Sequence, residues 1–179
     1  PSRTTLSAEA CPACCKLNRR PAIWEYMSQA RQFKTKHANF KYSEERVWLN
    51  GNANQIAKDI RRTLVPAIHK PDLQEAYYTS VNNILNAYSN FNKNVGYVQG
   101  MNIIASCVLY NVCNSDYSFI STYEEQAFWL FTLLLEQYSI KLCFSANMRK
   151  VFELSDSLEF NLQKNQGSVF NHINRSDVR

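Results

Sequence analysis

The sequence predicts an all-α fold in which several helices share one hydrophobic core. The chain has 179 residues but only 4 glycines and 5 prolines, whereas a β-sandwich or β-barrel needs a turn signal about every 8–12 residues. Apolar residues make up 45% of the chain and aromatic residues 13%, which is ample material for a buried core. Apolar side chains also recur at intervals of three and four, which is the period of an amphipathic helix.

The first part of the chain is expected to hold an irregular segment and two helices. Residues 1–18 are small and polar, show no period, and are predicted to form an irregular lead-in. From Pro21 to Phe33 apolar residues recur at three and four, which predicts a helix with proline in its first turn. Residues 34–53 are expected to be mostly loop, and a short helix is expected over 54–63.

The middle of the chain shows the clearest helical pattern. Pro71 and Asp72 open a helix that keeps one apolar stripe through to Phe91. The stripe consists of Leu73, Ala76, Tyr77, Val81, Ile84, Leu85 and Tyr88. Residues 92–96 break this helix, and a second helix of core-like composition is expected over about 98–112.

A further helix is expected to lie at the centre of the core. Ser121 or Thr122, followed three residues later by Glu124 or Glu125, is typical of a capping box at a helix start. The helix that follows, to about residue 138, is apolar nearly all round, which indicates burial on every side.

The C-terminal part of the chain is expected to add one more helix. Its apolar stripe runs over about 146–164 and fades through Gln166 and Gly167. No internal repeat and no linker interrupts the chain, which favours one domain. The densest apolar run, residues 127–135, is about half as long as the ~18–20 residues of a membrane-spanning helix.

The charge is concentrated at the front of the chain. Residues 1–62 carry 12 basic and 5 acidic side chains, and residues 63–179 carry 8 and 10. A basic face suits an anionic partner, which leaves nucleic acid, a membrane surface and a nucleotide-carrying protein as candidates. Nucleic acid is disfavoured, because no basic run is interleaved with aromatics and no zinc-finger or recognition-helix spacing is present.

The cysteines do not complete a metal site. Cys11, Cys14 and Cys15 make half of a zinc-binding pattern, and no second CxxC or HxxxH follows. We therefore expect no metal, with a zinc-stabilised adaptor as a minor alternative. No signal peptide is visible, so we expect a reducing, cytoplasmic compartment with free thiols.

Two stretches carry side chains that a core does not need. In the first, Ile56 and Ile60 anchor one face of the 54–63 helix, while Asp59 and Arg62 lie three residues apart on another. A carboxylate at this spacing can hold a guanidinium in one rotamer. The alternative is an ordinary exposed ion pair that contributes at most ~0.5 kcal/mol.

The second stretch is a glycine-flanked turn that leads into a helix. Gln99 lies between Tyr97 and Gly100, and Gly96 precedes them. Glycine beside a helix start permits close approach of another molecule to the backbone, and a glutamine there can both donate a hydrogen bond to a water and accept one from it. An ordinary loop glutamine in a glycine-punctuated turn is the alternative.

Together these stretches resemble the TBC domain, the Rab GTPase-activating module. The resemblance rests on Ile56-x-x-Asp59-x-x-Arg62, on Tyr97-x-Gln99-Gly100-Met101-Asn102, on Arg20-Pro-Ala-Ile-Trp24, and on Glu125-Gln-Ala127-Phe128-Trp129. The four motifs occur in the family's order and spacing and cover about residues 19–165. The resemblance implies an all-α, multi-helix TBC-type domain over 19–179, with its N-terminal lobe complete and its C-terminal lobe truncated.

The resemblance also implies roles for single residues. Arg62 would act as an arginine finger in the nucleotide site of a partner GTPase, and Gln99 would orient the attacking water. Asp59 would orient Arg62, and Tyr97 would hold the glutamine loop, with Ile56 and Gly100 as further supporting residues. Arg61 lies ~100° away on the helix and should point elsewhere.

The implied partner is a GTP-bound Rab-family GTPase, which would bring its own GTP and Mg²⁺, so the chain is expected to need no cofactor. Peripheral association with endomembranes would come through that partner. The alternative is a non-catalytic helical module that binds a GTPase or a trafficking partner without stimulating GTP hydrolysis.

Overall fold

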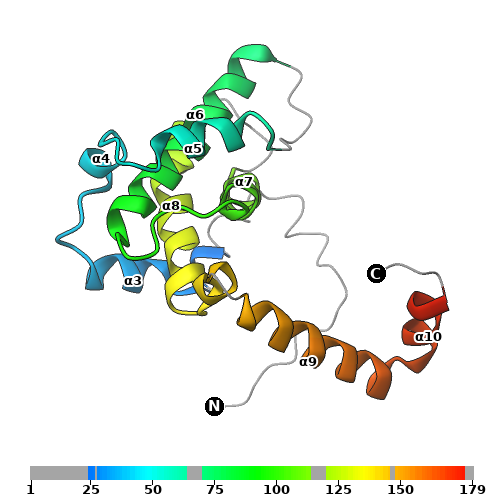
Figure 1. Cartoon of the computed structure of the whole chain (residues 1–179). Coiled ribbons are helices and arrows are strands. Elements are labelled where there is room, and N and C mark those ends of the chain that lie inside the picture. Colours follow the sequence, from blue (N-terminus) through cyan, green and yellow to red (C-terminus); the bar gives the residue numbers. More distant parts are fainter. Residues whose placement is uncertain (1–23, 27, 64–69, 114–119, 146–147, 176–179) are drawn as a thin grey trace. The chain divides into compact units, whose positions relative to one another are not determined.

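The computed structural model describes residues 24–26, 28–63, 70–113, 120–145 and 148–175 (Figure 1). Every regular element among these residues is a helix, which confirms the all-α class. In chain order the elements are α3 (Ala30–Lys36), α4 (Tyr42–Glu45), α5 (Ala53–Ile60), α6 (Pro71–Phe91), α7 (Met101–Val112), α8 (Ile120–Glu136), the 3₁₀ helix η2 (Ile140–Phe144), α9 (Arg149–Asn165) and α10 (Gly167–Arg175).

The chain divides into two compact units, and the division falls between Leu134 and Leu135. In the first unit α6 is the longest helix, and its bounds are those that the sequence predicts. Pro71 occupies the first helical turn, where its missing N–H costs nothing, and Asp72 places a negative charge at the positive end of the helix dipole. The predicted stripe is buried at Tyr77, Val81, Ile84, Leu85 and Tyr88 and half-buried at Leu73 and Ala76.

The helix α8 lies in the core of the first unit, as its composition predicts. Phe128, Phe131 and Leu133 are completely buried. Phe128 stacks on the Phe40 ring at a centroid distance of 5.5 Å, and Phe131 meets Tyr88 of α6 edge-on at 5.3 Å. Burial of each such ring stabilises the fold by roughly 1.5–3 kcal/mol.

The predicted capping box is wrong, because α8 already begins at Ile120 and so contains Ser121 and Thr122. The glutamates of that pattern have other partners. Glu124 accepts hydrogen bonds from the Tyr42 hydroxyl at 2.7 Å and from Arg46 at 2.9 Å.

The prediction of one helix over 21–33 is also wrong where the structure describes this segment. Gln29 has a left-handed backbone with φ of 59°, and α3 starts at the next residue. The Ser28 hydroxyl accepts a hydrogen bond from the Ala30 N–H at 3.3 Å, so it competes with helix continuation. Tyr26 is 87% exposed and does not belong to a buried stripe. Pro21 lies outside the described residues, as does the predicted lead-in.

The segment 34–53 contains more helix than predicted. The helix α3 continues to Lys36, and the short α4 follows. A single buried tyrosine, Tyr42, fixes α4 in place, and one apolar residue has no period that a sequence pattern could reveal. The bounds of α5 and α7 are also shorter than expected, at Ala53–Ile60 and Met101–Val112.

The second unit contains η2, α9 and α10. The helix α9 agrees with the predicted 146–164, but η2 and α10 were not predicted, and the chain turns helical again at Gly167, where the pattern was expected to fade. No residue of α9 is buried, and Phe152 and Leu158 are more than 60% exposed. None of the described helices is both long enough and apolar enough to cross a membrane.

Candidate functional site

The arginine segment is the end of α5 and the turn after it. Ile56, which is completely buried, and Ile60 anchor α5 in the core, and Asp59 on the adjacent side of the helix is buried with them. Arg62 follows the helix, and its side chain is 66% exposed. Its Nη2 donates to Oδ1 of Asp59, three residues earlier. The guanidinium is therefore held at one end and open to solvent over most of its surface.

Asp59 is a buried carboxylate with three donors. Gln55 Nε2 donates to its Oδ2 at 3.0 Å and the Tyr97 hydroxyl donates to the same oxygen at 2.9 Å, while Arg62 serves the other oxygen. Burial by itself would raise the pKa of Asp59, but the hydrogen bonds from Gln55, Tyr97 and Arg62 outweigh it and lower the pKa. The carboxylate is therefore ionised at neutral pH.

The glutamine segment depends on two glycines. Gly96 has a φ of 63° and Gly100 a φ of 103°, and at both values the backbone of a residue other than glycine would be strained. A Cβ at Gly96 would also stand 2.9 Å from Nδ2 of Asn52. Between the glycines the chain exposes Gln99 and buries Tyr97. Gly100 then precedes the first residue of α7.

The two segments meet at one cavity of about 760 Å³. Arg62 and Gln99 both line it, together with Thr63, Ile103 and Cys107. The Tyr97 hydroxyl links the two segments because it donates a hydrogen bond to Asp59. Burial, together with the neighbouring Asp59 carboxylate, raises the pKa of Tyr97. The structure thus brings the two predicted catalytic side chains to one concave surface, although 36 positions separate them in the chain.

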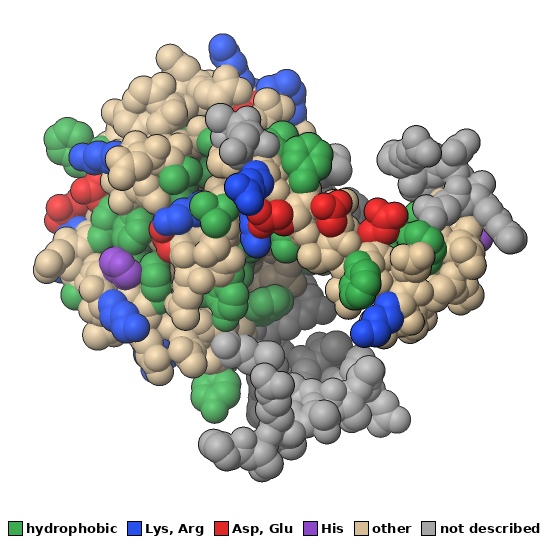
Figure 2. Space-filling model, turned by 60° about the horizontal axis from the view of Figure 1, so that its bottom comes forward, with side chains coloured by type: hydrophobic (Ala, Val, Ile, Leu, Met, Phe, Trp, Pro, Cys, Tyr) green, Lys and Arg blue, Asp and Glu red, His purple; other side chains and the backbone are tan. Residues whose placement is uncertain are grey.

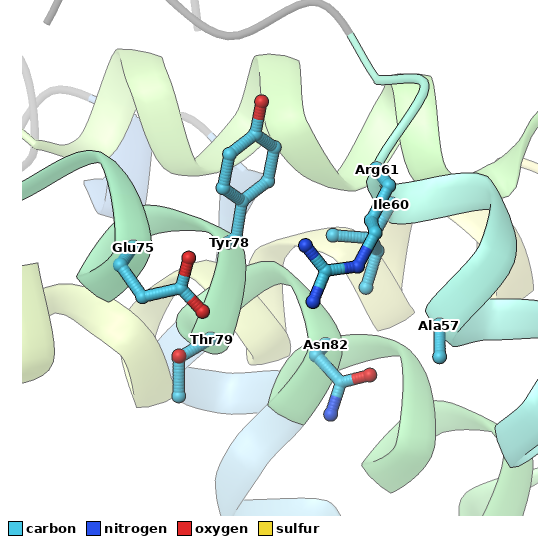
Figure 3. A pocket seen from close by; sticks show the side chains of 7 residues that line it. All are labelled: Ala57, Ile60, Arg61, Glu75, Tyr78, Thr79 and Asn82. Carbon is cyan, nitrogen blue, oxygen red and sulfur yellow. The ribbon is translucent and has the colours of Figure 1, made fainter. Parts of the chain in front are cut away.

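Arg61 occupies different surroundings from its neighbour. Figure 3 shows its side chain between α5 and α6, near Glu75, Tyr78 and Asn82. These residues line a separate cavity of about 220 Å³. The expectation that Arg61 points away from Arg62 agrees with this placement.

Two residues of the site carry contacts that the sequence did not predict. Asn102, in the first turn of α7, and Thr63, next to Arg62, are both buried and hydrogen-bonded to each other at 2.7 Å. Asn102 belongs to the motif that starts at Tyr97, but neither the motif nor the helical period shows which distant residue its side chain meets.

The remaining sequence motifs have structural positions. Glu125 pairs with Lys34 at 2.7 Å and accepts a hydrogen bond from Trp129 Nε1 at 3.1 Å, while Ala127 and Phe128 are core residues. Trp24 is 42% exposed. Arg20 and the cysteine cluster at 11–15 lie outside the described residues. Among the residues that the structure describes, no group of His, Cys, Asp or Glu could hold a metal ion.

The surface carries mixed charges on the face shown in Figure 2. Lysine and arginine side chains lie there among acidic ones and form no continuous basic patch.

The site defines a class of all-helical domain in which an arginine, tied by a buried aspartate, and an exposed glutamine line one cavity. Comparison with known families gives the particular class. Residues 18–179 match the Rab-GTPase-TBC domain, and the chain belongs to this family.

Two relatives illustrate the similarity. The chain is 28% identical to the GTPase-activating protein GYP5 of Eremothecium gossypii over 164 residues, which are 89% of this chain and 17% of the relative. It is 32% identical to the Growth hormone-regulated TBC protein 1-A of Danio rerio over 124 residues, which are 66% of this chain and 31% of that protein. The chain therefore spans less than a third of the length of either relative.

Proposed function

We propose that this domain accelerates GTP hydrolysis by a Rab-family small GTPase in its GTP-bound state. The observation that carries the proposal is the shared cavity of Arg62 and Gln99. Membership of the TBC family supports a GTPase as the partner, and one relative is named a GTPase-activating protein.

The chemistry of phosphoryl transfer needs the two groups that this cavity presents. Negative charge spreads over the transferred phosphoryl group and the leaving oxygen, and an arginine supplied in trans stabilises it, with a rate gain of ~10³–10⁵. Arg62 has the planar fork that bridges two oxygens, and Asp59 holds it in one rotamer. The guanidinium is ready before the partner binds, so less conformational entropy is lost on docking.

Gln99 would supply the second function, which is to orient the attacking water. Its amide oxygen can accept a hydrogen bond from the water while its NH₂ group donates one to a phosphoryl oxygen. The chain contains no P-loop, so GTP and Mg²⁺ belong to the partner. Under this proposal the protein works on the cytoplasmic side of endomembranes, where the partner GTPase is bound.

A single-turnover GTP hydrolysis assay against a panel of Rab GTPases tests the proposal. The unsubstituted chain should accelerate at least one of them, and Arg62→Lys should lose more than ~90% of the acceleration, because lysine keeps the charge and lacks the fork. Arg61→Lys is the matched control and should keep the activity, since Arg61 lines a different cavity.

Thermal unfolding should be nearly the same for both variants, because both side chains are exposed. Binding of GTP-loaded Rab without any acceleration would replace the proposal with a non-catalytic binding role. Retention of more than a tenth of the acceleration by Arg62→Lys would exclude Arg62 as the finger.

A further inference from the structure

Asn102 is a buried side chain that contacts both halves of the site. On one side its Nδ2 donates to Thr63 Oγ1 at 2.7 Å and to the backbone oxygen of Asp59 at 3.4 Å. On the other side its Oδ1 accepts a hydrogen bond from the Gly100 N–H at 3.0 Å and lies 3.3 Å from the Tyr97 hydroxyl. The residue is only 6% exposed.

These contacts reach the immediate neighbours of the two functional side chains. Thr63 follows Arg62 in the chain, and Gly100 follows Gln99. A shift of Asn102 would therefore move the backbone beside both side chains, and it would change the distance between them.

The chemistry of the contacts requires an amide in this orientation. A backbone N–H can only donate, so Gly100 needs the oxygen of Asn102. The carbonyl of Asp59 can only accept, so it needs the nitrogen. The Thr63 hydroxyl donates to that same carbonyl at 2.9 Å, which leaves its lone pairs to receive Nδ2 of Asn102. No other side chain of this size offers a donor and an acceptor side by side.

We propose that Asn102 is a positioning residue that clamps the glutamine segment to the turn after α5 and so sets the spacing of Arg62 and Gln99. This inference rests on the proposed function. It adds that the turn after α5 and the glutamine segment are held in a fixed geometry before a GTPase binds. Because misplacement by about 1 Å can cost ~10²-fold in rate, the clamp should matter for the rate of the chemical step.

A second buried asparagine offers a matched control. Asn86 of α6 is completely buried, and its Nδ2 donates to the Asn82 carbonyl at 3.0 Å, within its own helix. Its Oδ1 has no hydrogen-bond partner among the described residues. Substitution of Asn86 therefore removes a buried amide without touching either half of the site.

The experiment compares Asn102→Ala, Asn86→Ala and the unsubstituted 179-residue chain. Two quantities are measured, namely the exchange rate of the Gly100 amide by NMR and single-turnover GTP hydrolysis by a Rab over a range of domain concentrations. Asn102→Ala should speed Gly100 exchange and lower the maximal hydrolysis rate by about 10-fold or more, with a half-saturating concentration that changes less than ~3-fold. Asn86→Ala should leave Gly100 exchange and the maximal rate unchanged.

Thr63→Val provides a second variant that keeps the shape of the side chain and removes the hydroxyl, which receives Asn102 and also donates to the Asp59 carbonyl. It should lower the maximal rate in the same direction, and the loss should not add to that of Asn102→Ala, because both changes release the same contact. Asn102→Ala combined with Gln99→Ala should likewise lose little more than Gln99→Ala alone.

Each outcome decides between the two claims. Unchanged Gly100 exchange in Asn102→Ala overturns the clamp, whether or not a Rab is stimulated. Faster Gly100 exchange with no stimulation by the unsubstituted chain supports the clamp and overturns the proposed function. Equal rate losses in Asn102→Ala and Asn86→Ala, or full additivity with Gln99→Ala, would show a general loss of structure and overturn the positioning role.

Discussion

The turn after α5 and the helix α9 differ in how deeply their side chains are buried and in how far along the chain their hydrogen-bond partners lie. Around Asp59 and Asn102 the buried polar atoms have partners, and two of the hydrogen bonds, Tyr97 to Asp59 and Asn102 to Thr63, join positions about 40 residues apart in sequence. In α9 no residue is buried, and side-chain hydrogen bonds such as those that Glu153 accepts from Arg149 and Ser157 join residues four positions apart. The candidate catalytic groups therefore lie in a region that long-range contacts hold together, whereas α9 carries local ones.

Substitution in the buried core should give the largest effect on stability. Phe131→Ala should lower the free energy of unfolding by about 3–5 kcal/mol, because it removes a completely buried ring that packs against Tyr88. Phe152→Ala on α9 is the matched control and should change it by no more than about 0.5 kcal/mol. Chemical denaturation measures both values, and a loss of similar size at the two positions would remove the contrast.

Asp59→Asn should give an intermediate and pH-dependent effect. Folding lowers the pKa of Asp59, since the donors Gln55, Tyr97 and Arg62 outweigh the effect of burial. The ionised carboxylate therefore stabilises the fold above its ordinary pKa of about 3.9, and this contribution is lost as the pH falls through the lowered folded-state pKa. At pH 7 the substitution should cost about 1–3 kcal/mol.

Denaturation at several pH values provides the measurement for this prediction. The difference in unfolding free energy between the unsubstituted chain and Asp59→Asn should be constant near neutral pH and shrink below about pH 4. A difference that stays the same down to strongly acidic pH would show that the Asp59 carboxylate does not gain stability from its donors.

Backbone hydrogen exchange should distinguish the exposed helix α9 from the buried helix α6, and this is the smallest of the expected effects. The backbone amides of α9 should exchange with little protection, because exposed apolar side chains such as Leu158 contribute little packing energy. The amides of α6 should exchange only through global unfolding, since residues 84–89 of this helix are all buried. Uniformly slow exchange across residues 149–165 would contradict this prediction.

Local signals made part of the fold predictable from the sequence. The bounds of α6 follow from Pro71 at its start and the turn after Phe91, and the central place of α8 follows from its apolar composition. The break at Gln29 and the helix after Gly167 were not predictable, because weak apolar periods do not reveal where the backbone turns left-handed or where a short helix resumes.

The pairing of distant residues in the site was not predictable from the sequence either. Sequence motifs identified Arg62 and Gln99, but only the fold brings them to one cavity. The contacts of Asn102 with Thr63 and of Tyr97 with Asp59 join distant positions, and their distances depend on how α5, α6 and α7 pack. Side-chain type and helical period describe one segment at a time, so they do not specify such pairs.

Under the proposed function, Gln99 of the activating protein orients the attacking water. Single-turnover phosphate release should be measured for the unsubstituted chain and for Gln99→Ala, each with a wild-type Rab and with a Rab whose own switch glutamine is replaced by leucine. The account predicts substantial stimulation of the mutant Rab by the unsubstituted chain, and a loss of about 10²-fold or more for Gln99→Ala on the wild-type Rab. A mutant Rab that does not respond, together with a fully active Gln99→Ala, would contradict it.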